Sequence, residues 1–173
     1  LLSLINDILD ISKIEEGKMD VVIDDLSPIE LGEHFRRHFS HVAENRGLDF
    51  HVNVGEDVPE HFYTDRQRLE QIIKNLLSNA LKFTQNGEVR ISACAEGDSE
   101  VRFAVTDTGI GIPQDMHGNL FEDFVQIDTP LQKRLRGTGL GLSLCKRFAE
   151  LLSGRVGVDS KPGVGSTFYV VIP

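Results

Sequence analysis

The most constraining feature of this sequence is a segment, residues 65–83, that carries two different helical faces. Thr64 and Gln67 have the spacing of a capping box and predict that a helix begins beside them. The apolar residues that follow recur at the i, i+3, i+4 spacing: Leu69, Ile72, Ile73, Leu76, Leu77 and Ala80. Because an apolar stripe of this length has to be covered, the segment predicts a helix packed on a second layer of structure.

Strand patterns on both sides of this helix supply that layer. Six segments have the residue alternation or composition of β-strands: 19–27, 48–54, 88–96, 101–108, 155–160 and 166–172. Turn dipeptides, Gly97-Asp98 and Pro162-Gly163, join the last four segments into two hairpins.

Two further helices are expected. Ser27, Pro28 and Glu30 form a helix start, and that helix should run to about Arg46. A last helix covers about 140–152. Hairpins and helices in this order predict an α+β fold, an α/β sandwich in which a mixed, mostly antiparallel sheet carries helices on one face.

The first 18 residues predict a separate short helix before this domain. Leu1, Leu4, Ile5, Ile8 and Ile11 share one helical stripe. The segment begins without an initiating Met or a cap, so we expect a fragment cut within a longer helix. The predicted division is therefore 1–18 for this helix and 19–173 for the main domain.

Charge and cysteine content narrow the function. The formal net charge of −9 excludes the basic surface that nucleic acid requires. No apolar run is long enough to span a bilayer, and no secretory signal is visible. Cys94 and Cys145 have no metal-ligand spacing, and we expect two buried, reduced thiols in a cytoplasmic protein.

The second face of the 65–83 helix is polar. Asn75, Asn79 and Lys82 fall within roughly 60° of one another around the helix axis. Asparagine is a mediocre helix former, so its repeated use indicates either plain surface amides or the wall of a polar site. An amide oxygen suits Mg²⁺, and a neighbouring lysine suits phosphate.

Two glycine-rich segments, 107–112 and 137–142, point toward an anion site. Their glycines permit left-handed backbone dihedrals, and the second segment directly precedes a predicted helix, whose first N–H groups attract phosphate. Neither segment has the spacing of a Rossmann loop or a P-loop, and ordinary turns also need glycine. Asp107 ends an alternating apolar strand, where its carboxylate could accept an exocyclic amino group.

Three motifs in this order closely resemble the nucleotide-binding boxes of sensor histidine kinases: NLLSNALKF (75–83), DTGIGI (107–112) and GTGLGL (137–142). LFEDFVQ (120–126) resembles the family's phenylalanine box, and GSTFYVVIP (165–173) its closing strand. The resemblance covers about residues 19–173, and the first 18 resemble the end of the family's dimerisation helix. It implies the Bergerat-type ATP-binding fold shared with gyrase, Hsp90 and MutL, with ATP and Mg²⁺ as cofactors.

The resemblance also implies roles for matching residues. Asn79 would hold Mg²⁺, with Asn75 supporting it, and Lys82 would contact phosphate. Asp107 would accept a hydrogen bond from the adenine amino group. The other implied nucleotide-binding residues are Phe83, Gly109, Gly111, Ile112, Phe121, Phe124, Gly137, Thr138, Gly139, Leu140, Gly141 and Thr167.

Residues 113–136 would form a mobile lid over the ATP, anchored by Phe121 and Phe124. Lys133 and Arg134 stand where the family often has basic lid residues facing the γ-phosphate, although solvated loop charge explains them equally well. The lid departs from many relatives at Arg136, where they have glycine.

The implied function is the catalytic domain of a two-component kinase, which transfers the γ-phosphoryl group of ATP to a histidine on a dimerisation hairpin. None of the six histidines here is followed by the family's acceptor pattern: His34, His38, His41, His51, His61 and His117. We therefore expect the acceptor upstream, on the chain's own hairpin in a homodimer, and no autophosphorylation by this fragment alone. A response regulator or receiver domain would be the final partner, and a membrane-bound parent stays open.

Two alternatives remain at this stage. One is a non-catalytic nucleotide-binding module, and the other is a gyrase-like ATPase. Asn75 disfavours the second, because the gyrase branch has a glutamate at that place as its general base and an amide cannot take a proton.

Overall fold

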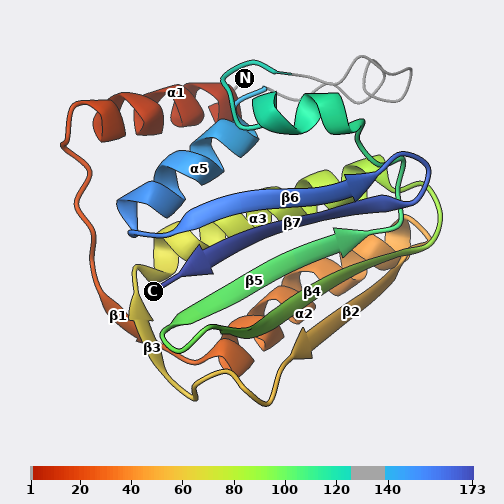
Figure 1. Ribbon diagram of the computed structural model, residues 1–173, viewed down its shortest axis with the longest axis horizontal. Helices are drawn as coiled ribbons and strands as arrows, with labels where there is room; N and C mark the ends of the chain where they lie inside the picture. Colours follow the sequence, from red (N-terminus) through yellow and green to blue (C-terminus); the bar gives the residue numbers. More distant parts are fainter. Residues whose placement is uncertain (1, 126–138) are drawn as a thin grey trace.

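The computed structural model describes residues 2–125 and 139–173, and in this part of the chain a five-stranded sheet organises the fold (Figure 1). Its strand order is β2-β4-β5-β7-β6. These strands span Asp49–Val54 (β2), Glu88–Glu96 (β4), Glu100–Asp107 (β5), Arg155–Lys161 (β6) and Gly165–Ile172 (β7). The helices are α1 (Leu2–Glu15), α2 (Pro28–Asn45), α3 (Arg66–Phe83), the 3₁₀ helix η1 (Gln114–Asn119) and α5 (Gly141–Leu151).

The sheet is mixed and mostly antiparallel, as the hairpin pattern predicted. β2 pairs with β4 in parallel, whereas β4–β5, β5–β7 and β6–β7 are antiparallel. The register aligns Val105 with both Ile91 and Phe168, so apolar side chains of three neighbouring strands share one face. The α+β fold class is confirmed.

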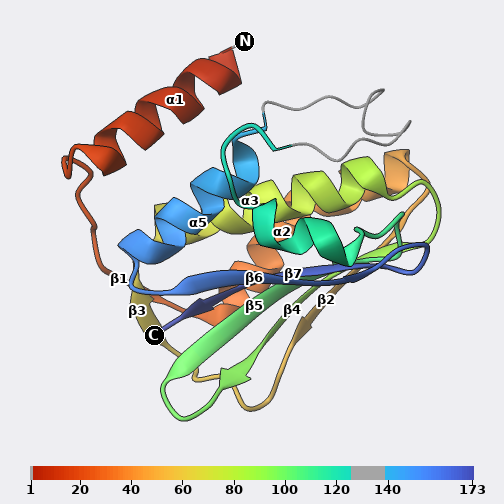
Figure 2. The ribbon, with the colours of Figure 1, turned by 45° about the horizontal axis from the view of Figure 1, so that its top comes forward.

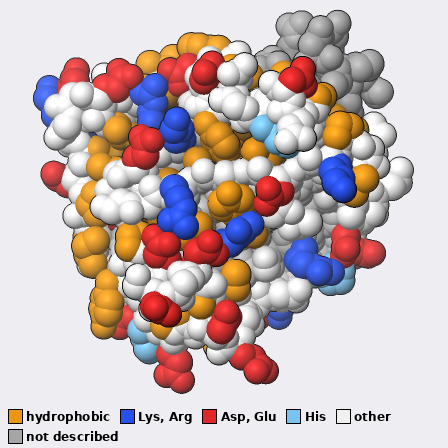
Figure 3. Space-filling model, in the orientation of Figure 1, with side chains coloured by type: hydrophobic (Ala, Val, Ile, Leu, Met, Phe, Trp, Pro, Cys, Tyr) orange, Lys and Arg blue, Asp and Glu red, His pale blue; other side chains and the backbone are white. Residues whose placement is uncertain are grey.

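Helices α2, α3 and α5 cover that apolar face, and Figure 2 shows them stacked on one side of the sheet. Phe35 of α2, Ile72 of α3 and Phe148 of α5 are each at most 2% exposed. Burying side chains of this size contributes about 1.5–3 kcal/mol each, which is why the stripe of α3 fixes the layer arrangement. On the opposite face basic and acidic side chains are interspersed (Figure 3).

The start of α3 differs from the prediction. Thr64 lies in a short strand, β3 (Phe62–Thr64), and the cap is Asp65, whose Oδ1 accepts from the Arg68 backbone N–H at 3.2 Å. The other oxygen of Asp65 accepts from the Val22 N–H at 3.0 Å, so one buried carboxylate both caps the helix and holds the incoming chain. Aspartate and threonine are both good N-cap residues. Asp65 is the cap here because its second carboxylate oxygen also bonds Val22.

Smaller differences concern strand and helix ends. Of the predicted strand 19–27 only Asp24–Leu26 (β1) is a strand, paired with β3 in a separate two-stranded sheet. After α5 the left-handed residue is Ser153, with φ 63°, rather than Gly154. Both cysteines are free, but only Cys145 is buried, because Cys94 is half-buried. The start of α2 is as predicted, with Ser27 Oγ accepting from the Glu30 N–H at 3.3 Å.

Helix α1 lies beside α5 and is held by polar contacts together with Ile11 and Ile14, which pack against the core (Figure 1). Arg147 of α5 joins Glu15 of α1 at 2.6 Å and Asp123, in the segment after η1, at 3.0 Å. Gln71 of α3 adds a bond to Asp10 at 3.4 Å. No residue of α1 is buried, so its docking depends on few groups. Within the described residues no helix is both long and apolar enough to span a membrane.

Arg147→Ala is expected to loosen α1 selectively. Of the two ion pairs of Arg147, only the one with Glu15 reaches α1. A surface ion pair contributes about 0.2–1 kcal/mol, so its loss should speed amide exchange in α1 by roughly 1.5- to fivefold. Hydrogen exchange read by mass spectrometry measures this. Arg155→Ala is the matched control, because Arg155 makes ion pairs with Glu96 and Glu100 within the sheet and none with α1. Equal exchange of α1 in both variants would contradict the assignment.

Candidate nucleotide-binding site

A cavity of about 300 Å³ opens between α3, the start of α5 and the ends of β5 and β7. Nine of the residues proposed from the sequence line it: Asn75, Asn79, Lys82, Phe83, Asp107, Gly111, Ile112, Gly139 and Gly141. The polar face of α3 and both glycine segments therefore meet around one space, although they are far apart in the sequence.

The α3 wall carries the amides and the ammonium group. Asn75, Asn79 and Lys82 are all half-buried, one helical turn apart. Partial burial lowers the pKa of Lys82, because the charged amine loses water there. Asn75 also forms a hydrogen bond with the thiol of Cys145, whose pKa burial raises to about 12. That bond fixes the amide against α5.

At the opposite wall stands Asp107, the last residue of β5. Asp107 is 9% exposed, and its Oδ1 accepts a hydrogen bond from the Gly109 backbone N–H at 2.9 Å. Burial raises the pKa of this carboxyl group, while backbone hydrogen bonds from Gly109 and Ser166 act in the opposite direction. The result is a fixed carboxylate that lines the same cavity as the apolar side chains of Ile112 and Phe168, suited to accept an N–H group from a ligand.

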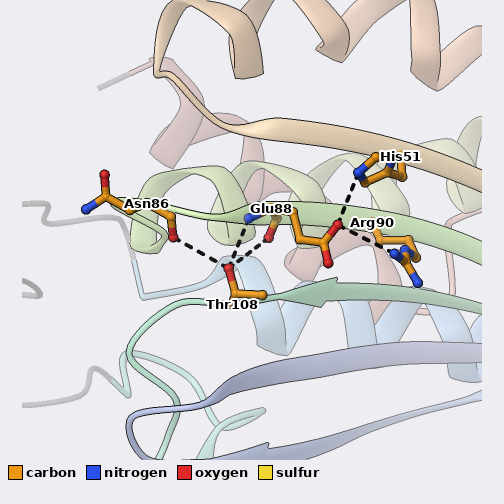
Figure 4. Close-up of polar contacts among 5 residues, drawn as sticks. All are labelled: His51, Asn86, Glu88, Arg90 and Thr108. Carbon is orange, nitrogen blue, oxygen red and sulfur yellow. Dashed lines mark hydrogen bonds and ion pairs between the residues drawn. The ribbon is translucent and has the colours of Figure 1, made fainter.

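Thr108 fastens the strand end that presents Asp107 (Figure 4). Its Oγ1 accepts from the Glu88 backbone N–H at 3.0 Å, and its own N–H donates to the Glu88 carbonyl at 3.2 Å. The Glu88 side chain points outward to His51 at 3.1 Å and Arg90 at 3.5 Å. These bonds hold the β4–β5 edge next to the cavity.

The loop 109–112 passes close to the β6–β7 turn. Gly111 has φ 71°, and a Cβ there would meet the Lys161 carbonyl and lie 2.9 Å from Cα of Pro162. The Gly163 N–H donates to the Ile110 carbonyl at 2.8 Å. Only glycine fits this combination of dihedral and contact.

Gly111→Ala is expected to destabilise the fold by about 2 kcal/mol or more, a fall in Tm of roughly 5 °C, because the methyl group clashes with backbone and the dihedral is strained. Thermal unfolding followed by circular dichroism measures it. Gly118→Ala is the control: within residues 2–125 and 139–173 no atom lies within 4 Å of its Cβ position, and its φ is ordinary. Similar Tm values for both variants would refute the packing argument.

The second glycine segment ends at the first turn of α5. Gly139 has φ 76°, and its carbonyl accepts from the Phe124 N–H at 2.8 Å. Leu140 is the N-cap and its side chain makes no capping hydrogen bond, and among the described residues nothing lies within 4 Å of a Cβ on Gly141. Gly141 lines the cavity, so the first turn of α5, whose N–H groups have no intrahelical partner, faces the space where an anion site is expected.

Five proposed residues do not line the cavity: Gly109, Phe121, Phe124, Leu140 and Thr167. Gly109 acts through its bond to Asp107, and Phe121 packs on Phe168 with ring centroids 6.3 Å apart. The Phe124 residue is 66% exposed, so its backbone rather than its ring meets the site. Four others fall outside the described residues: Lys133, Arg134, Gly137 and Thr138.

Thr167 is displaced by strand alternation. Its hydroxyl lies 3.0 Å from that of Thr106, on the sheet face away from the helices, whereas its neighbours Ser166 and Phe168 line the cavity. Residues two apart along a strand share one face, so Ser166 lies on the same face as Val170, which is in the core. This alternation is visible in the sequence and could have identified Ser166. Sequence reasoning also missed Ser3 and Asp7 of α1, because nothing local indicates where that helix docks.

Mg²⁺ prefers oxygen ligands and usually keeps several of its waters, with one or two protein ligands completing its shell. Within residues 2–125 and 139–173 no group of three His, Cys, Asp or Glu side chains could hold a metal ion. Asn75 and Asn79 offer neutral oxygens, which suits a metal that keeps its waters and is held largely by phosphates. The residues fit a magnesium ion that arrives with a triphosphate.

Comparison with known proteins agrees with this geometry. Residues 64–173 match the family described as histidine kinase-, DNA gyrase B-, and HSP90-like ATPase. Across the whole chain, hybrid signal transduction histidine kinase B of Dictyostelium discoideum is 42% identical and sensor histidine kinase RcsC of Escherichia coli K12 is 40% identical. The chain spans only 9% and 18% of those relatives.

Solved structures give the same picture. Full-length ShkA in complex with AMPPNP superposes with a TM-score of 0.89 at 32% identity, over 99% of this chain and 35% of that one. The catalytic domain of histidine kinase ThkA superposes with a TM-score of 0.74 at 25% identity, over 88% and 97%. The chain therefore belongs to the histidine kinase-, DNA gyrase B- and HSP90-like ATPase family, as an ATP-binding catalytic domain of the histidine kinase kind.

Proposed function

We propose that residues 19–173 bind Mg·ATP and pass its γ-phosphoryl group to a histidine on a dimerisation hairpin, and that residues 1–18 are the end of that hairpin's second helix. The observation that carries the proposal is the single cavity that joins the Asn79–Lys82 wall to Asp107. A triphosphate needs cationic and amide donors, a purine needs an acceptor at a dry wall, and this cavity offers both.

Asp107 orients the nucleotide in this scheme. Its carboxylate accepts from the exocyclic amino group of adenine, while Ile112 and Phe168 provide apolar surface for the base. The triphosphate then extends toward Lys82 and the first N–H groups of α5, which spread its negative charge.

The phosphoryl step depends on positioning. Lys82 keeps a proton and stabilises charge on the phosphate oxygens as the terminal group leaves in line. Asn79 would hold Mg²⁺ through its amide oxygen, with Asn75 beside it. A bound Mg²⁺ would supply positive charge that offsets the negative charge developing on the phosphate oxygens.

Transfer to protein is favoured over hydrolysis. Asn75 has no basic atom to take a proton from water, so the site lacks a general base at the place where the gyrase branch carries one. No histidine of the described residues lines the cavity, which supports an acceptor on the upstream hairpin. The partners would be that hairpin in a homodimer and then a response-regulator or receiver aspartate, in the cytoplasm.

Incubating this chain with the upstream hairpin of its parent and γ-labelled Mg·ATP tests the proposal. Acid-labile phosphohistidine on the hairpin supports it. Tight ATP binding without transfer would favour a regulatory nucleotide module instead, and steady phosphate release without labelled hairpin would favour a gyrase-like ATPase.

A further inference from the structure

Ser160 of β6 lies behind the cavity wall and is bonded to three groups. Its Oγ accepts from the Ile112 backbone N–H at 2.7 Å and donates to the Gly165 carbonyl at 3.0 Å. It also lies 2.7 Å from the hydroxyl of Ser166. Ile112 and Ser166 line the cavity, whereas Ser160 does not.

These three bonds determine which of the two serine hydroxyl groups donates its proton to the other. A hydroxyl has one proton to donate and two lone pairs to accept with. The Ile112 amide can only donate and the Gly165 carbonyl can only accept, so the single proton of Ser160 is used on Gly165. With all three bonds formed, Ser166 donates its proton to Ser160. The Ser166 hydroxyl, on a residue that lines the cavity, is then left with lone pairs and can only accept from a ligand.

Ser166 also adjoins Asp107. Ser166 is 6% exposed, and its backbone N–H bonds the Asp107 carboxylate. Two acceptors, the Ser166 hydroxyl oxygen and the Asp107 carboxylate, therefore share one dry corner of the cavity. A ligand that brings N–H donors satisfies this corner, whereas one that brings a carbonyl oxygen leaves acceptors facing each other.

We infer that Ser160 is a positioning residue that fixes Ser166 as an acceptor, and thereby makes the pocket select a 6-aminopurine over a 6-oxopurine. The inference rests on the proposed function, because it concerns the base of the same nucleotide. Ser160 acts only through Ile112 and Ser166 and touches no ligand.

Ser160→Ala tests this, with ATP and inosine triphosphate, its 6-oxo counterpart, as the two probes in calorimetry. ATP affinity should fall about five- to tenfold, since the variant frees the proton of Ser166 and loosens Ile112. The affinity for inosine triphosphate should fall less than the affinity for ATP, so the ratio of the two affinities should shrink several-fold. Ser160→Thr, which keeps the hydroxyl, should restore it, and Ser99→Ala in the distant β4–β5 turn should change neither affinity.

Other outcomes overturn the inference. Unchanged ATP affinity, or an equal fall for both nucleotides together with a lower Tm, would mean that Ser160 is only structural. Should Ser160→Ala fail to fold, Ser166→Ala must show the same loss of preference, and an unchanged preference there refutes the inference. If the unaltered chain binds no ATP, the proposed function fails instead, which is a separate result.

Discussion

Replacing Asn79 with alanine is expected to abolish the dependence of ATP binding on Mg²⁺. The variant removes the amide oxygen assigned to the metal and leaves the adenine end intact, so affinity in the presence of Mg²⁺ should fall about a hundredfold, roughly 3 kcal/mol. Isothermal calorimetry with excess Mg²⁺ and then with EDTA measures both affinities. The two should become equal in the variant.

Asn45→Ala, at the exposed end of α2, is the matched control, because it removes the same amide from a residue that does not line the cavity. Circular dichroism confirms that both variants fold. A variant at Asn79 that still binds ATP more tightly with Mg²⁺ than without it would exclude the metal role.

Asp107→Asn should weaken ATP binding by about ten- to hundredfold. The substitution keeps size and shape but replaces a charged acceptor with an amide, and hydrogen bonds to charged groups contribute about 1.5–3 kcal/mol. Asp98→Asn, exposed in the turn between β4 and β5, provides the control. Calorimetry that finds equal ATP affinity in both variants would remove Asp107 from adenine recognition.

The raised pKa of Asp107 gives this site a pH dependence. Between the ordinary value of 3.8 and the raised value, the folded chain binds more protons than the unfolded chain. The contribution of Asp107 to the free energy of unfolding therefore falls as the pH rises through that window. ATP affinity should rise over the same window, since the ionised carboxylate is the better acceptor, and Asp107→Asn should abolish both trends.

The features that the sequence predicted best are those that depend on helical periodicity and on the backbone freedom of glycine. The stripe of α3 fixed its packing, and its Asn75, Asn79 and Lys82 face emerged on the cavity because a helix is rigid. Gly111 and Gly139 needed positive φ, which glycine signals directly.

Features that depend on contacts between segments distant in the sequence could not be predicted from local patterns. Asp65 replaced Thr64 as the cap because its second oxygen meets Val22, 43 residues away in sequence. Thr167 is a different case, because the alternation of β7 with Val170 in the core is a local signal. It turns the Thr167 hydroxyl away from the cavity that Ser166 lines.

Ser3 and Asp7 place the first turns of α1 on the rim of the same cavity as Asn75. ATP binding and the docking of α1 therefore involve the same rim of the cavity, so the two equilibria are thermodynamically linked. If undocking α1 alters ATP affinity by some factor, saturating ATP must shift the docking equilibrium by that factor. A change that moves α1 away from this rim would therefore change ATP affinity, and ATP binding would change the docking of α1 by the same factor.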